Sequence, residues 1–142
     1  MRRKIIIDTD PGIDDALAIF FALNAPELEV LALTTVFGNV PVELATRNAL
    51  SLLEIAQLTL PVATGVKAPL VIQPLPHPEV VHGSDGFGNI NLDEPTQQAD
   101  KRSAAELIID LVHAHPNQIS IIALGPLGNL AKVLALEPTI TT

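Results

Sequence analysis

Apolar and polar positions along the chain fall into short segments whose spacing predicts strands and helices in alternation. Four short apolar runs predict strands, at residues 4–7, 28–36, 61–64 and 119–124. Four longer segments with apolar residues broadly at helical spacing predict helices, over residues 14–25, 41–58, 103–115 and 126–138. Strands that alternate with helices in this way pair in parallel through right-handed crossovers. We therefore expect an α/β fold with a mostly parallel sheet and helices on both faces.

The length and the order of these segments predict a single α/β domain over residues 1–142. The first predicted helix is apolar nearly all round, so we expect it to lie centrally in the fold. Residues 139–142 come where the alternation would bring another strand, so we expect an incomplete sheet. Residues 65–100 are rich in Pro and Gly with little periodicity, which predicts a long loop bordering an active or binding site.

Composition and charge narrow the classes of function. With 48% hydrophobic and 17% charged residues, the chain has the composition of a folded globular protein. A net charge of −8 opposes binding to nucleic acid or anionic membranes, and four Phe with no Trp or Tyr offer few base-stacking surfaces. The apolar run Ala16–Leu23 is too short to span a bilayer. The same negative charge suits a cation or a neutral small molecule as ligand. The absence of Cys excludes disulfides and thiolate metal sites, so we expect a cytoplasmic protein.

Four carboxylates are crowded into the turn between the first predicted strand and helix, at Asp8, Asp10, Asp14 and Asp15. Carboxylates this close repel one another, and burying one without a partner is costly. A helix N-terminus favours a carboxylate by only ~0.3–1 kcal/mol, which is too little to gather four. A divalent cation is a far stronger local charge, and ligands that are all oxygen favour calcium or magnesium.

Two other interpretations of these acids stay open at this point. Asp14 could cap the helix while Asp8 and Asp10 are solvated residues at the end of a strand, which explains each acid but not their concentration. An apolar strand followed by Asp-x-Asp also resembles the start of the haloacid-dehalogenase-type phosphotransferases, with Asp8 as nucleophile and magnesium nearby. That family usually continues with Thr or Val and an apolar run, whereas here residues 11–15 intervene.

Four motifs in series resemble those of one enzyme family. The segment DTDPGIDDALA (residues 8–18) is similar to the N-terminal signature of the nucleoside hydrolases, the inosine/uridine-preferring family that splits ribonucleosides into ribose and free base. TTVFGN (34–39), HGSDGFG (82–88) and ALGPLGNLA (123–131) follow in the order that this family requires. The resemblance runs from Arg3 to Pro138. It implies a Rossmann-like nucleoside hydrolase fold, a purine or pyrimidine ribonucleoside substrate, and a place in nucleoside catabolism and salvage.

The resemblance also implies a calcium site. Asp10, Asp15 and the backbone carbonyl of Leu124 match the family's calcium ligands. Asp10 matches the general base that takes a proton from the attacking water. A cation lowers the pKa of that water and positions it, which is why metal and carboxylate are combined. We assign Asp8 to a supporting role behind the ligands.

Three further residues match positions at which the family contacts the ribose or the base. Asp14 matches an acceptor of a ribose hydroxyl, and Asn39 a polar group lining the same pocket. His82 matches a histidine found near the base-binding end in some members, where the leaving base must gain a proton or a hydrogen bond. Without the other motifs, a histidine that follows two valines could equally be an ordinary loop residue with no role in the site.

Members of the family are about twice as long as this chain. Their second half supplies an Asn/Glu/Asn set for the ribose hydroxyls and a His-Asp pair that completes the calcium shell and faces the base. The resemblance therefore implies weak calcium binding and little or no turnover by these 142 residues alone, or a non-catalytic remnant of the family. Family members are dimers or tetramers, so we expect a homo-oligomer, and base preference is not specified by these motifs.

Overall fold

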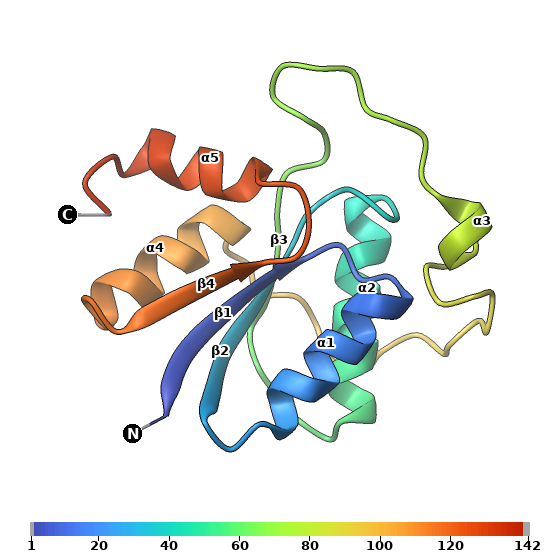
Figure 1. The fold of residues 1–142 in the computed structure, drawn as a ribbon, viewed down its shortest axis with the longest axis horizontal. Helices are drawn as coiled ribbons and strands as arrows, with labels where there is room; N and C mark the ends of the chain where they lie inside the picture. Colours follow the sequence, from blue (N-terminus) through green and yellow to red (C-terminus); the bar gives the residue numbers. More distant parts are fainter. Residues whose placement is uncertain (1, 141–142) are drawn as a thin grey trace.

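The computed structural model describes residues 2–140 and contains one four-stranded parallel sheet. The strands are β1 (Arg3–Thr9), β2 (Leu28–Thr35), β3 (Val62–Thr64) and β4 (Ile119–Ala123), in the spatial order β3-β2-β1-β4 (Figure 1). All three strand pairs are parallel, and β1 lies between β2 and β4. The predicted α/β class and parallel sheet are confirmed.

Helices cover both faces of the sheet, as predicted. α1 (Ile13–Asn24) and α2 (Val42–Ile55) lie on one side, and α4 (Ala104–Ala114) and α5 (Gly128–Leu136) on the other (Figure 1). The side chains of β1 explain this arrangement, because successive residues of a strand point to opposite faces. Ile5 and Ile7 join the core cluster under α1 and α2, whereas Ile6 joins the cluster under α4 and α5.

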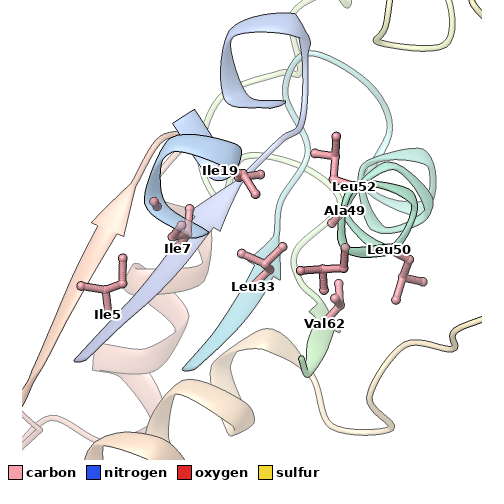
Figure 2. Packing of buried hydrophobic residues seen from close by; sticks show 10 residues of the cluster. Ile5, Ile7, Ile19, Leu33, Ala49, Leu50, Leu52 and Val62 are labelled. Carbon is pink, nitrogen blue, oxygen red and sulfur yellow. The ribbon is translucent and has the colours of Figure 1, made fainter. Parts of the chain in front are cut away.

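The larger core cluster lies between the sheet and the first two helices. Figure 2 shows Ile7 and Leu33 of the sheet in this cluster, together with Ile19 of α1 and Leu52 of α2. These four side chains are at most 3% exposed. β1 pairs with β2 along its whole length, with a register shift between Ile5 and Ile6, and with β4 from Lys4 to Asp8. This pairing on both sides fixes the carboxyl end of β1 within the sheet edge, which is where the acidic segment begins.

The prediction that α1 lies centrally is wrong for the part of the chain that the structure describes. Ile13, Leu17 and Phe21 are 43%, 68% and 76% exposed, and they lie four residues apart on one side of the helix. Only the opposite side, with Ile19 and Ala22, is buried against the sheet. A continuous apolar sequence therefore shows that either side of this helix could be covered, but not which side is.

The segment between β3 and α4 is long, as predicted, but it contains a short helix that its sequence did not indicate. This helix, α3 (Glu79–His82), is four residues long and is followed by Gly83, whose φ of 73° favours glycine. The predicted helix at 41–58 also ends earlier, at Ile55, because Gln57 adopts a left-handed backbone with φ of 57°. None of the helices in residues 2–140 has the length and apolar character needed to cross a membrane.

Candidate active site at the carboxyl edge of the sheet

The acidic segment lies at the edge of the sheet where the parallel strands end. β1 ends at Thr9, and the chain turns through Pro11 and Gly12 directly into α1. β4 ends beside it, with Ala123 opposite Asp8 in the strand register. In open α/β sheets, ligands bind beyond the carboxyl ends of the strands. The fold therefore places the predicted site residues where a ligand site is expected.

Asp10 is a buried carboxylate packed between two close turns. Its Oδ2 accepts a 2.6 Å hydrogen bond from the backbone N–H of Asn39. A Cβ at Gly38 would lie 1.9 Å from Oδ2, and one at Gly125 would lie 2.6 Å from Oδ1. Burial, with a smaller contribution from the negative charge of Asp15, raises the pKa of Asp10 to about 6. Glycine at both flanking positions therefore leaves the space that this carboxylate occupies, and a side chain at either position would collide with it.

Asn39 connects Asp10 to Asp15. Its side-chain Nδ2 donates to the Asp10 carbonyl and to Asp15 Oδ2, both at 3.2 Å. The hydroxyl of Thr9 donates to the other Asp15 oxygen at 2.6 Å, and Gly12 N–H donates to Oδ2 at 3.3 Å. Asp15 is thus fixed in the first turn of α1, with both oxygens held. The structure brings together Asp10, Asp15 and Asn39, which the sequence assigned to one site.

Asp14 and His82 lie at the outer side of this site. The Asp14 side chain is 81% exposed, and its Oδ1 lies 3.9 Å from His82 Nδ1. His82 is buried at 8% exposure on α3, rather than in an open loop, and its Nδ1 accepts the Ile13 N–H at 3.3 Å. Because Nδ1 is the acceptor, the neutral ring carries its proton on Nε2. The segment around α3 therefore brings His82 to the N-terminus of α1.

Leu124 directly follows β4, one residue before Gly125, which packs near Asp10. Its backbone N–H donates to the Asp8 carbonyl at 2.7 Å, which continues the pairing of β4 with β1. Gly125, the next residue, is in close contact with Asp10 Oδ1. Leu124 is 40% exposed, and its backbone N–H ties it to the end of β1 where the acidic segment begins.

A cavity of about 520 Å³ opens against Asp10. One wall is formed by residues 37–39, the turn after β2 that carries Asn39. The other wall is apolar and comes from Pro126 and from residues of the long segment after β3, including Ile72 and Leu75. A polar floor with apolar walls is typical of small-molecule sites.

The donors at this site fit a hard cation. Within residues 2–140, no group of three or more acidic or histidine side chains is arranged to hold a metal by itself. The predicted set needs only two carboxylates, Asp10 and Asp15, together with the Leu124 carbonyl, and all of these are oxygen donors of the kind calcium prefers. Asp15 Oδ1 and Asp10 Oδ2 each accept one hydrogen bond and keep a further lone pair for a ligand, whereas Asp15 Oδ2 already accepts two.

Several residues that organise the site were not predicted. The His77 ring is 2.7 Å from the Gly38 carbonyl, and Asn48 Nδ2 donates to the carbonyls of Pro11 and Asp85 at 3.3 and 2.8 Å. Asn129, in α5, donates to the fully buried Asp8. Asn48 and Asn129 are polar residues within apolar helical segments, and Asn129 also belongs to the motif at 123–131, but neither signal shows what the residue contacts.

The fold and this site define a class: an α/β protein with an acidic, oxygen-lined site at the carboxyl edge of a parallel sheet. A family model described as "Inosine-uridine preferring nucleoside hydrolase" matches residues 5–142. The chain belongs to this nucleoside hydrolase family.

Relatives of the chain are similar over almost all of its length. It is 52% identical over 139 residues to a probable uridine nucleosidase 2 of Arabidopsis thaliana, covering 96% of this chain and 43% of the relative. It is 45% identical to the inosine-uridine preferring nucleoside hydrolase of Leishmania major, covering 99% and 45% of the two chains.

Solved structures of the same family superimpose closely. A plant nucleoside hydrolase matches with a TM-score of 0.93 at 45% identity, over 99% of this chain and 45% of that one. A purine-preferring ribonucleoside hydrolase from Gardnerella vaginalis matches with a TM-score of 0.92 at 31% identity, over 97% and 45% of the two chains. The chain thus spans less than half the length of the relatives it matches.

Proposed function

We propose that this chain carries the calcium-binding and water-activating part of a ribonucleoside hydrolase active site. The reaction is hydrolysis of the N-glycosidic bond of a purine or pyrimidine ribonucleoside to ribose and free base. One observation carries the proposal: Asn39 hydrogen-bonds to both Asp10 and Asp15 beside a cavity, in a chain of the nucleoside hydrolase family. The metal, the substrate and the activity are all part of this proposal.

The metal would be held by Asp10, Asp15 and the Leu124 carbonyl. Calcium bound there would lower the pKa of a bound water and orient the two ribose hydroxyls. Two of the donors are fixed before any ligand arrives, since Asp15 is held by Thr9 and Asn39. Asp10 is held by the Asn39 backbone. Preorganised oxygens of this kind lose little freedom on binding.

Asp10 is the general base in this scheme. Its Oδ2 is held by the Asn39 N–H, so Oδ1, on the side of Gly125, is the oxygen that takes the proton from water. The water oxygen then bonds to the anomeric carbon of ribose, and the N-glycosidic bond breaks with its electron pair passing to the base. The neighbouring carboxylates stabilise the positive charge that develops on the sugar.

Asp14, Asn39 and His82 bind the substrate in this scheme. Asp14, which is exposed beside His82, accepts a hydrogen bond from a ribose hydroxyl in this scheme, while Asn39 lines the cavity next to Asp10. His82 has one nitrogen occupied by the Ile13 N–H, so only Nε2–H is available to donate to the departing base. We also propose that the segment from residue 65 to 100, which supplies the apolar wall, is the loop that covers the active site.

The test is calcium-dependent binding and cleavage of nucleosides. Ribose release from uridine and inosine is measured with excess calcium and with a chelator, together with calorimetric binding of each nucleoside. We expect calcium-dependent binding with slow turnover by these 142 residues, because the relatives have further residues that this chain does not match. The variant Asp10→Asn should lose nucleoside binding and ribose release, whereas Asp93→Asn should keep both. Nucleoside binding that is unchanged by the chelator and by Asp10→Asn would contradict the proposal.

A magnesium phosphotransferase with Asp8 as nucleophile is disfavoured by the position of that residue. Asp8 is 0% exposed and does not line the cavity, and its Oδ1 accepts hydrogen bonds from Thr34 and Asn129. Asp10 lies at the cavity instead. The other alternative is a non-catalytic family member that binds ribose without turnover. The ribose-release assay distinguishes it from a hydrolase, because such a protein would bind the nucleoside but release no ribose.

A further inference from the structure

Asn129 is a buried amide that joins three segments at the carboxyl edge of the sheet. It is 1% exposed and lies in the first turn of α5. Its Nδ2 donates to Asp8 Oδ1 at 2.7 Å and to the Thr35 carbonyl at 2.8 Å. Its Oδ1 accepts the Val66 N–H at 2.9 Å. One side chain thus connects α5 to the ends of β1 and β2 and to the chain after β3.

The chemistry of these three contacts requires an amide. Asp8 and the Thr35 carbonyl are acceptors and need the two protons of Nδ2, whereas the Val66 N–H needs an acceptor. An aspartate at position 129 would place a second carboxylate against Asp8 and remove both donors. Gly65 keeps the space open, because a Cβ there would lie 2.1 Å from Asn129 Oδ1.

The same contacts fix the turn from Leu124 to Gly128, which joins β4 to the first residue of α5. The turn is held at its start by the Leu124 N–H, which donates to the Asp8 carbonyl. Asn129 follows the turn directly and holds its other end through the Asp8 side chain. In between, Gly125 is packed against Asp10. Both ends of the turn are therefore tied to one residue of β1.

We propose that Asn129 is a positioning residue that sets the 124–128 turn, and with it the Leu124 carbonyl, relative to Asp10. Its effect on calcium rests on the function proposed above, whereas its effect on the turn does not. Without the amide, Asp8 Oδ1 and the Val66 N–H each lose a partner, and the turn is attached only by its backbone bonds to Asp8. The Leu124 carbonyl then samples several positions instead of one.

The test compares Asn129→Asp with Asn48→Asp by amide hydrogen exchange without metal. Asn48 is a matched control, because it is equally buried at 1% and donates to two carbonyls on the other side of the site, those of Pro11 and Asp85. We expect exchange in residues 124–128 and at Val66 to rise ~10-fold or more in Asn129→Asp only. Asn48→Asp should instead raise exchange around residues 85–91.

Calcium binding gives a second readout. In Asn129→Asp protein that is folded by circular dichroism, we expect calcium affinity to fall ~10-fold, as for other residues that orient metal ligands. Equal exchange increases across both regions in both variants, or unchanged exchange at 124–128, would overturn the proposal. If the wild type binds no calcium, the proposed function fails, and the exchange data still decide the role of Asn129 in the turn.

A measurement on the unmodified chain covers the case in which Asn129→Asp does not fold. In nitrogen-15 spectra, both protons of the Asn129 side-chain amide should exchange slowly, whereas those of the exposed Asn91 exchange fast. The Asn129 and Val66 resonances should also shift when calcium is added. An Asn129 amide that exchanges as fast as that of Asn91 would overturn the proposal.

Discussion

At the scale of single residues, the site combines a buried carboxyl group with close packing by the two glycines that flank it. Asp10 is 5% exposed and held between two turns, and burial is the main reason why its pKa rises from 3.8 to about 6. A carboxyl group whose pKa is higher in the folded than in the unfolded chain is ionised at a cost in stability. This cost is absent below about pH 4, grows between pH 4 and 6, and is complete above about pH 6.

The first prediction follows from this cost. Asp10→Asn should stabilise the calcium-free chain at pH 7 by ~1 kcal/mol once solvent screening is allowed for, because the variant has no buried charge to ionise. The gain should vanish at pH 4, where Asp10 is largely protonated in the folded chain. Urea unfolding at both pH values measures the difference, with the exposed Asp93→Asn as control. An Asp10→Asn variant that is less stable than the wild type at pH 7 would contradict this prediction.

The second prediction concerns the space beside Asp10. Gly38→Ala would place a methyl group 1.9 Å from Asp10 Oδ2, so the carboxylate or the turn must move. We expect the variant to fold and to lose at least ~10-fold in calcium affinity, measured by calorimetry. Val71→Ala, in a side chain that is 95% exposed, serves as the control. Unchanged affinity in Gly38→Ala would show that this close packing does not matter for the metal.

At the scale of helices and strands, the period of the apolar residues was sufficient to predict most elements but not their surroundings. The runs at 4–7 and 119–124 became β1 and β4, since continuous β-branched sequence suits a buried parallel strand. The exposure of Leu17 and Phe21 on α1 was not predictable, because the sequence cannot show which side of an apolar helix is covered. α3 was missed because four residues are too few for a periodic pattern.

The third prediction tests a helix start that the sequence indicated. Ser103 accepts a hydrogen bond from the Glu106 N–H, and Glu106 accepts in turn from the Ser103 N–H, as in a capping box. Ser103→Ala should lower the free energy of unfolding by ~1 kcal/mol and leave calcium affinity unchanged. Thermal unfolding followed by circular dichroism measures this, with the exposed Ser120→Ala of β4 as control. A loss of calcium affinity in Ser103→Ala would show that α4 is coupled to the site.

At the scale of the whole molecule, the parallel topology explains how residues far apart in sequence form one site. Asp10, Asn39 and Leu124 follow β1, β2 and β4, and parallel strands end at the same edge. Motifs that follow predicted strands could therefore be assigned to this edge from the sequence alone. The contacts of Asn129, Asn48 and His77 could not, because they depend on how the turns pack against one another. Residues of this kind are identified only from coordinates.

The central claim is that Asp10, Asp15 and the Leu124 carbonyl form a calcium site. Calorimetric titration of the 142-residue chain with calcium chloride tests it most directly. We expect one site with a dissociation constant weaker than ~1 µM, because only part of an oxygen shell is offered. The heat should disappear in Asp15→Asn and persist in Asp93→Asn. Submicromolar binding would contradict the expectation of a partial shell, and binding that survives in Asp15→Asn, or no binding at all, would contradict the site itself.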